Sequence, residues 1–410
     1  MTEIITTLEN LKDVQRLAES GANELLIALD GISSTAASKY SLDELKEIAK
    51  AVKAANAELA NATDAAKADV AGKGAGKGAG KGAGKNTQVK IAIRANLTLH
   101  EGMLPEAEKI LAAISELDKE YVEATAETDS TVDSADGKST GIISSIFFAD
   151  PSIYMLAKKI DQENGIEPGS ESDQAGKTSM TSKLIYDPEM LMTSINDANW
   201  WLDRGIRGIS ISPILTLQET KEIAEATKKA VVTVHGRTLM SRSFRKLLSS
   251  YKEVSEEDPD FVNPPEAQVE AASQAIVAEE TQAKAASASD AEAASTPAKK
   301  DWQAVGNKNL TLIEKSRSAK MPVYEDETGT LIYSDDVLDS FNFIDELLKA
   351  SPFALLVEGS FADIEMQAEA VKAYSRILAG EDAKTIGAEY QEKFREEPFD
   401  SGYYEQKTVK

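Results

Sequence analysis

The chain has 410 residues, with 45 Lys and Arg against 69 Asp and Glu, a formal net charge of −24, and no Cys. The absence of Cys excludes disulfides, Cys-ligated zinc or iron–sulfur clusters and a cysteine nucleophile within this chain. The negative charge argues against nucleic-acid binding driven by the overall field, although a local basic patch is still allowed. The sequence has no signal-peptide pattern and no apolar run of about 18 residues, so we expect a cytoplasmic protein without a membrane span.

Four stretches have the composition of solvated linker. They are rich in Ala, Gly, Ser and charged residues, and cannot bury enough apolar surface to offset the entropy lost on ordering. We expect them to be mobile, with weak helix in their Ala-rich parts. They are residues 54–88, 122–141, 162–182 and 252–302. The remaining sequence has the length of one barrel domain, so we expect a single interrupted domain over 1–380 and a C-terminal tail over 381–410.

The rest of the chain alternates short apolar runs with amphipathic helical patterns, in the order of a repeated strand and helix. The apolar runs predict buried parallel strands at residues 4–6, 24–29, 89–95, 142–148, 183–186, 208–212, 231–234 and 353–357. The amphipathic patterns predict helices at residues 8–20, 42–52, 104–117, 153–160, 195–202, 217–226 and 364–378. Eight strands with alternating helices predict an α/β fold, the (β/α)8 TIM-type barrel, and a doubly wound open sheet is the alternative.

Polar residues end several of these predicted strands. Barrel enzymes place their chemistry at the C-terminal edge of the strands, so these side chains are expected to converge. Each also has a structural interpretation, because Asp before Pro is typical of helix N-caps and a lone His is often a satisfied structural group. The candidate catalytic residues are His235, Glu358, Asp150 and Asp187, and two candidate substrate-binding residues are Arg94 and Asn96.

The sequence does not predict a metal or cofactor site. The glycines of the Gly/Lys repeat at 72–85 all occupy even positions, so neither dinucleotide-binding nor P-loop spacing occurs within it. With only two His in the chain, His100 and His235, a multi-His metal site is impossible. We therefore expect no metal and no cofactor in this chain.

A local basic cluster follows His235. It contains Arg237, Arg242 and Arg245, with further Lys residues, and is interleaved with Phe244 and Tyr251. One interpretation is an anion site for phosphate, carboxylate or an RNA backbone, in which the three Arg bind substrate. The other is a solvated helix face paired with the acidic stretch that follows.

The stretch 234–240, Val-His-Gly-Arg-Thr-Leu-Met, resembles the His-Gly signature region of the collagenase-like peptidases of unknown catalytic type, peptidase family U thirty-two. The resemblance implies a (β/α)8 barrel, in agreement with the strand count. Further similar stretches occur in family order at 95–100, 148–151, 199–201, 322–330, 357–359 and 371–374.

The chain departs from the family at its cysteines. Members that modify RNA or quinones without oxygen use Cys after the His-Gly pair for an iron–sulfur cluster, whereas Leu239 and Lys246 stand here. The chain resembles the shorter, Cys-less members that are similar to a Cys-containing paralogue.

The resemblance thus implies a non-cluster subunit in a hetero-oligomer with that paralogue, assisting hydroxylation of a tRNA uridine, with residues 237–252 helping to hold an anionic partner. One alternative is a stand-alone collagenase-like hydrolase in which the four candidate catalytic residues polarise a water. Another is a degenerate barrel retained as a binding scaffold.

Overall fold

The computed structural model describes residues 2–34, 38–72, 88–128, 141–167, 179–257, 310–313 and 319–406. The chain divides into two compact units. The first comprises Met1–Leu239 with Tyr333–Lys410, and the second is Met240–Ile332. This division differs from the single domain expected over 1–380, because part of the stretch between the last two barrel strands forms a unit of its own.

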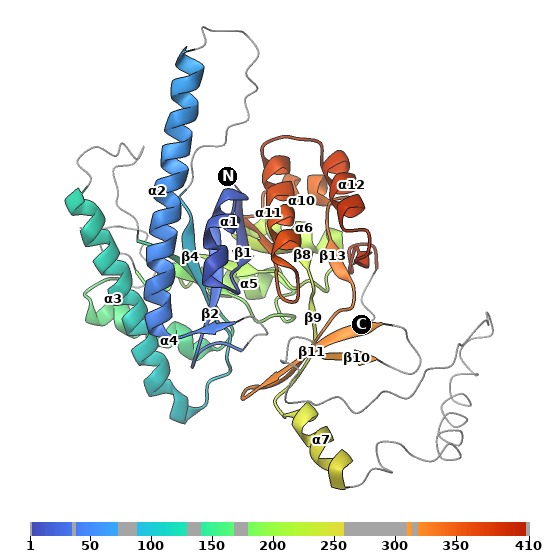
Figure 1. Cartoon of the computed structure of the whole chain (residues 1–410). Helices are drawn as coiled ribbons and strands as arrows, with labels where there is room; N and C mark the ends of the chain where they lie inside the picture. The colour runs from blue at the N-terminus through green and yellow to red at the C-terminus, as the bar shows by residue number, and fades with distance from the viewer. Residues whose placement is uncertain are drawn as a thin grey trace. The chain divides into compact units, whose positions relative to one another are not determined.

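A closed barrel of parallel strands forms the centre of the first unit (Figure 1). Its last strand pairs in parallel with both the first strand and the strand before it, so the sheet has no free edge. The predicted (β/α)8 barrel is therefore confirmed, and the open-sheet alternative is wrong. In barrel order the strands are β1 (Glu3–Thr7), β2 (Glu24–Leu29), β4 (Lys90–Ala95), β5 (Ile143–Phe148), β6 (Leu184–Tyr186), β7 (Gly208–Ser210), β8 (Ala230–Gly236) and β14 (Ala354–Val357).

Three short strands extend this sheet outside the barrel. β3 (Lys39–Tyr40) pairs with β2, β13 (Val337–Asp339) runs antiparallel to β8, and β15 (Phe399–Asp400) pairs with β13.

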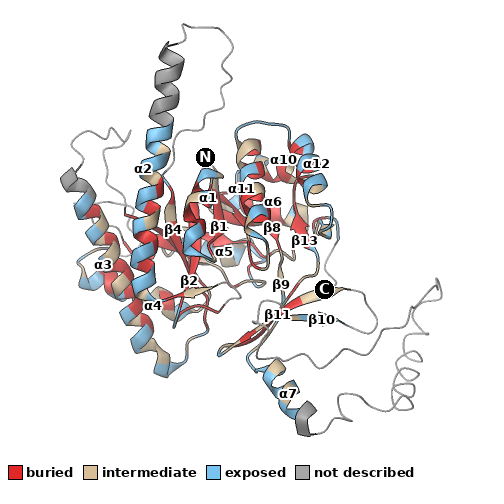
Figure 2. Cartoon of the chain, in the orientation of Figure 1, coloured by how far each residue is buried: buried red, intermediate tan, exposed pale blue. Residues whose placement is uncertain are grey.

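Helices connect the strands and bury one apolar face each against the barrel (Figure 2). Side-chain caps start several of them: Asp150, Ser194 and Thr216 each accept a hydrogen bond from a backbone N–H of the first turn. No helix among the described residues is long and apolar enough to cross a bilayer. The helices of this unit are α1 (Val14–Glu19), α2 (Leu42–Gly72), α3 (Leu104–Thr128), α4 (Pro151–Glu163), α5 (Ile195–Leu202), α6 (Leu217–Thr227), α10 (Ile344–Lys349), α11 (Ile364–Leu378) and α12 (Ala383–Lys393).

Two helices extend into stretches that the sequence suggested were linker. α2 continues to Gly72 and α3 to Thr128, although linkers were expected from residues 54 and 122. The reason is composition, since both extensions are rich in Ala, Glu and other strong helix formers. Helix in the Ala-rich parts of 54–88 and 122–141 was expected, although as weak helix; the helices extend further along these stretches than the predicted ranges 42–52 and 104–117. Most of the remainder of the four stretches lies outside the described residues.

The barrel interior separates an apolar middle from polar ends. At the N-terminal end, Arg207 Nη2 donates to Glu24 Oε1 at 2.8 Å and to Glu3 Oε2 at 3.0 Å. The middle layer fills the barrel, because alternate strand residues point inward. The inward-facing residues are Ile5, Leu26, Ala92, Phe147, Ile185, Val231, Ala354 and Leu356.

The segment expected as a C-terminal tail is instead part of the packed barrel unit. α12 begins after Asp382, whose side chain accepts from Thr385 N at 2.9 Å. Its Ala383, Ile386 and Tyr390 are buried and belong to the main apolar cluster. The expected boundary at residue 380 is therefore wrong, because the i, i+3, i+7 spacing of these three residues forms an apolar helix face.

The second unit holds a small antiparallel sheet and a helix. The sheet has the order β10 (Leu310–Ile313), β11 (Lys320–Asp326), β12 (Gly329–Tyr333) and β9 (Leu239–Ser243), and the helix is α7 (Leu247–Glu257). Glu325 on β11 accepts hydrogen bonds from Leu248 N at 2.6 Å, Ser249 N at 3.0 Å and Thr330 Oγ1 at 2.7 Å. Burial alone would raise the pKa of Glu325, but these hydrogen bonds lower it. This carboxylate fixes the start of α7 to the sheet.

Removing residues 381–410 is expected to abolish cooperative unfolding of the barrel, because it exposes the apolar surface that Ile386 and Tyr390 cover. Urea unfolding followed by near-ultraviolet circular dichroism would measure this. Removal of residues 407–410 alone serves as the control. An unchanged unfolding midpoint for the 1–380 chain would contradict the assignment of α12 to the core.

Candidate functional site

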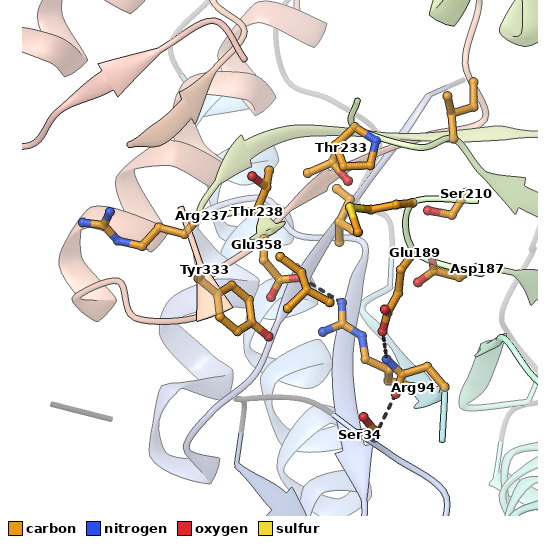
Figure 3. A pocket seen from close by; sticks show the side chains of 16 residues that line it. Ser34, Arg94, Asp187, Glu189, Ser210, Thr233, Arg237, Thr238, Tyr333 and Glu358 are labelled. Atoms are coloured by element: carbon orange, nitrogen blue, oxygen red, sulfur yellow. Dashed lines mark hydrogen bonds and ion pairs between the residues drawn. The ribbon is translucent and has the colours of Figure 1, made fainter. Parts of the chain in front are cut away.

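A pocket opens at the C-terminal ends of the barrel strands (Figure 3). It has a cavity of about 90 Å3. Its walls come from β4, β7, β8 and β14 and the loops that follow them, from the loops after β2 and β6, and from Leu239 and Tyr333. This is the end at which the sequence predicted a site. The polar residues that line it are Ser34, Arg94, Asn96, Asp187, Glu189, Ser210, Thr233, Arg237, Thr238, Tyr333 and Glu358.

An ion pair between Arg94 and Glu358 crosses the pocket. Arg94 Nη2 donates to Glu358 Oε2 at 2.8 Å, and their side chains are only 9% and 12% exposed. β1 and β2 lie between β4 and β14 in the sheet, so the pair joins strands that are not neighbours. Burial alone would lower the pKa of the Arg94 guanidinium, but Glu358 and Asp187 hold it above its ordinary value. Two residues predicted for different roles are therefore partners of each other.

The backbone beside Glu358 explains the glycine that follows His235. Gly236 has a φ of +112°, and a Cβ at this position would lie 2.1 Å from the carbonyl oxygen of Glu358. Only a residue without a side chain allows β8 to approach the end of β14 this closely. The His-Gly pair thus has a structural role in placing Glu358.

Asp187 is a second, partly buried carboxyl group of the pocket. Burial raises its pKa, while Arg94 and a hydrogen bond from Ser210 oppose that rise. Its carboxyl group therefore takes up a proton at a higher pH than an exposed Asp. Asp187 lines the same pocket as Arg94 and Glu358.

Asn96 links two loops at the edge of the pocket. Its Nδ2 donates to Glu189 Oε1 at 3.1 Å, and its Oδ1 accepts from Ser34 N at 2.9 Å. Glu189 has a left-handed backbone with φ of 59°, which a non-glycine residue adopts only at a cost. Glu189, Ser34 and Tyr333 were not predicted as site residues, although Glu189 lies only two residues after Asp187 in the sequence.

Asp150 has the structural role that its Pro neighbour suggested. Its Oδ1 accepts from Ser152 N and its Oδ2 from Leu99 N, both at 2.8 Å. It caps α4 and holds the loop after β4, and it is not among the residues that line the pocket. The structure therefore favours the N-cap interpretation over the catalytic one.

His235 does not point into the pocket. It is 2% exposed, its Nε2 lies 2.9 Å from Tyr390 Oη, and its ring contacts Phe341 and Tyr374. Burial lowers the pKa of His235 to about 3, so the ring is neutral at pH 7.

A bulge accounts for this orientation. Leu356 pairs with Thr233 but Val357 pairs with His235, so β8 contains one extra residue. Thr233 faces the pocket, and without the bulge His235 would face it as well. The expected catalytic placement of His235 is wrong for this reason.

The three arginines of the predicted cluster are divided between the two units. Arg237 donates to Ser334 O at 3.2 Å and to Glu397 Oε2 at 3.0 Å, and its side chain points away from Arg94 in Figure 3. Arg242 and Arg245 belong to the second unit and do not line the pocket.

Two guanidinium groups line the pocket, and each already has a carboxylate partner: Arg94 pairs with Glu358, and Arg237 pairs with Glu397. The lining also holds three carboxyl groups, those of Asp187, Glu189 and Glu358. This balance suits neutral or cationic groups that donate hydrogen bonds better than it suits phosphate. Within the described ranges, no group of three or more His, Asp and Glu side chains is placed to hold a metal ion.

Replacing Glu358 by Gln is expected to cost about 3 kcal/mol of unfolding free energy, because it leaves the Arg94 charge buried without its counter-ion. The double variant Arg94→Met, Glu358→Met is expected to lose less unfolding free energy than Arg94→Met or Glu358→Met alone. Urea unfolding of the wild type, the two single Met variants and the double variant gives the coupling energy. Additive effects of the two Met substitutions would show that the pair is not coupled.

The pH dependence of stability is expected to report the buried His235. Its pKa of about 3 in the folded state lies below the unfolded value of 6.5, so the unfolded state binds the proton first. Its contribution is complete above pH 6.5 and falls by about 1.4 kcal/mol per pH unit towards pH 3. Urea unfolding at pH 7 and pH 5 should show a larger loss in the wild type than in His235→Asn. Equal losses would contradict a neutral, buried imidazole.

Comparisons with known proteins give a similarity to one family over part of the chain. Residues 174–260 match the model of Peptidase family U32, about a fifth of the sequence. The matched range contains β6, β7, β8 and the His235-Gly236 pair. The resemblance expected from the sequence is confirmed over this range, and the similar stretches outside it are not part of the match. No curated protein matches the sequence.

Among solved structures, the chain is similar to the "mutually generated monomers" of the dimeric phosphoribosylanthranilate isomerase from Thermotoga maritima. The two share 9% identity with a TM-score of 0.23, over 57% of this chain and 86% of the other. Since this score is low, the barrel assignment rests on the strand pairing of the chain itself. The established relationship is therefore a similarity to Peptidase family U32 within residues 174–260.

Proposed function

We propose that this chain is the non-cluster subunit of a heteromeric enzyme, acting in the cytoplasm beside a Cys-containing paralogue in the hydroxylation of a tRNA uridine. The observation that carries the proposal is that the barrel keeps a built polar pocket at its C-terminal end although the chain has no Cys. The partial match to Peptidase family U32 supports the relationship to the paralogue.

The ion pair and hydrogen bonds among the pocket side chains support a ligand-binding role. The guanidinium of Arg94 is held by Glu358, and the amide of Asn96 is held between Ser34 and Glu189. Groups that are fixed in this way position a ligand with little loss of side-chain entropy. We infer that the carboxylates of Glu189 and Asp187 accept hydrogen bonds from N–H groups of the ligand.

We infer that RNA binds the basic stretch of the second unit. Arg242 and Arg245 lie there in a chain of net charge −24, so phosphate would be repelled from most other surfaces. This assignment keeps RNA contact separate from the barrel pocket, whose charge balance does not favour phosphate.

A second candidate function is hydrolysis by the chain alone. The observation that favours it is that Ser210 and Asp187 both line the pocket, which places a hydroxyl group near a partly buried carboxyl group whose pKa is raised by burial. His235 would have no part in this reaction, because its ring is directed towards Tyr390.

The purified chain and its Cys-containing paralogue are expected to form a stable complex, and only the complex should hydroxylate tRNA. Glu189→Gln is expected to lower this activity about tenfold while leaving the complex intact, because it weakens a carboxylate acceptor. Light scattering after size-exclusion chromatography measures the complex, and mass spectrometry of tRNA nucleosides measures the product. Glu163→Gln, an exposed change at the end of α4, is the control.

Two independently eluting proteins, or full activity of the paralogue alone, would contradict the subunit proposal. Gelatin cleavage by the purified chain that is lost in Asp187→Asn would instead favour the hydrolase.

A further inference from the structure

The described residues of helix α7 in the second unit are mostly exposed (Figure 2), and several of the exposed side chains are apolar. Leu247, Tyr251 and Val254 are 44%, 45% and 37% exposed, and Phe244 just before the helix is 70% exposed. The i, i+4, i+7 spacing places the three helical residues on one face, as an apolar stripe. A contiguous exposed apolar face of this kind is typical of a protein–protein contact.

The stripe is held in place within its own unit. Glu325 binds the N–H groups of Leu248 and Ser249, and Ser250 N donates to Lys246 O at 3.0 Å. The helical turn therefore begins at Lys246 and is anchored to β11. This surface is already ordered before a partner binds, so association does not include the entropy cost of ordering it.

The charges beside the stripe are arranged with opposite signs at its two ends. Lys246 and Glu253 are separated by seven residues and lie on the same flank of the helix. Lys246 is at the N-terminal end, where Arg245 adds a further positive charge, and Glu253 is near the C-terminal end. A helix with this pattern is complementary to a copy of itself that runs in the opposite direction.

We propose that α7 packs against α7 of a second copy of this chain in an antiparallel, two-fold symmetric pair. In such a pair the stripe faces itself across the axis, and Lys246 of each copy faces Glu253 of the other. A nucleic acid would use the cations of this surface but would gain little from Leu247 and Val254. On α7 itself, the charge pattern and the apolar stripe together therefore favour a second copy over RNA, whose proposed contacts, Arg242 and Arg245, precede the helix.

The contact is small, because α7 spans 11 residues, or about 16 Å. An interface of this length lies at the low end of specific contacts, so association is expected to depend on protein concentration in the micromolar range. The inference does not rest on the proposed function, since it is tested with the purified chain alone.

Sedimentation velocity of the full chain between about 1 and 100 μM is expected to show a monomer–dimer equilibrium. Leu247→Ser combined with Tyr251→Ser should leave a monomer over the whole range, because both side chains are exposed and their loss removes the stripe. Leu191→Ser, at a 75% exposed position in the first unit, is the matched control and should dimerise like the wild type.

A charge exchange tests the antiparallel geometry. Lys246→Glu places two like-charge contacts in the pair and should weaken dimerisation about tenfold at low salt. Adding Glu253→Lys exchanges the charges and should restore the wild-type dissociation constant. A wild type that stays monomeric at every concentration, or a double variant as weak as Lys246→Glu alone, would overturn the proposal. The proposal would also be overturned if the chain were monomeric and bound tRNA, and if Leu247→Ser with Tyr251→Ser abolished that binding.

Discussion

The buried ion pair between Arg94 and Glu358 is the constraint on which the barrel mouth depends. It joins β4 to β14 across two intervening strands, and neither charge can be removed without leaving the other in a poorly solvated place. Gly236 makes room for it, since any Cβ there would collide with the Glu358 carbonyl. Ser360 Oγ donates to the second carboxylate oxygen of Glu358 at 3.1 Å. The geometry of the pocket is therefore set by side chains that satisfy one another.

This arrangement decides which ligands the mouth favours. Because the guanidinium already has a carboxylate partner, it contributes little net positive charge to the pocket. Asp187 and Glu189 then leave an excess of acceptors in the pocket. Burial raises the pKa of Asp187, and a bound hydrogen-bond donor would stabilise its carboxylate form. The proposed subunit role uses this property and requires no nucleophile in the chain.

Sequence patterns predicted the barrel well because they reflect local physics. Apolar runs predicted all eight strands, and Asp150 caps a helix as its Pro neighbour suggested. The convergence of Arg94, Asp187 and Glu358 followed from strand ends in a closed barrel. The features that the sequence did not predict depend on contacts between segments far apart in the chain. The bulge that turns His235 outward arises from pairing with β14, more than a hundred residues later, and the second unit is completed by Glu325 binding α7.

A crystal structure of the chain grown with phosphate, and another grown with a guanidinium salt, would test the account of the barrel mouth most directly. We expect the ion pair between Arg94 and Glu358 to be present in both crystals, and guanidinium to occupy the pocket beside Glu189 and Asp187. Phosphate bound to Arg94, with Glu358 displaced, would contradict it.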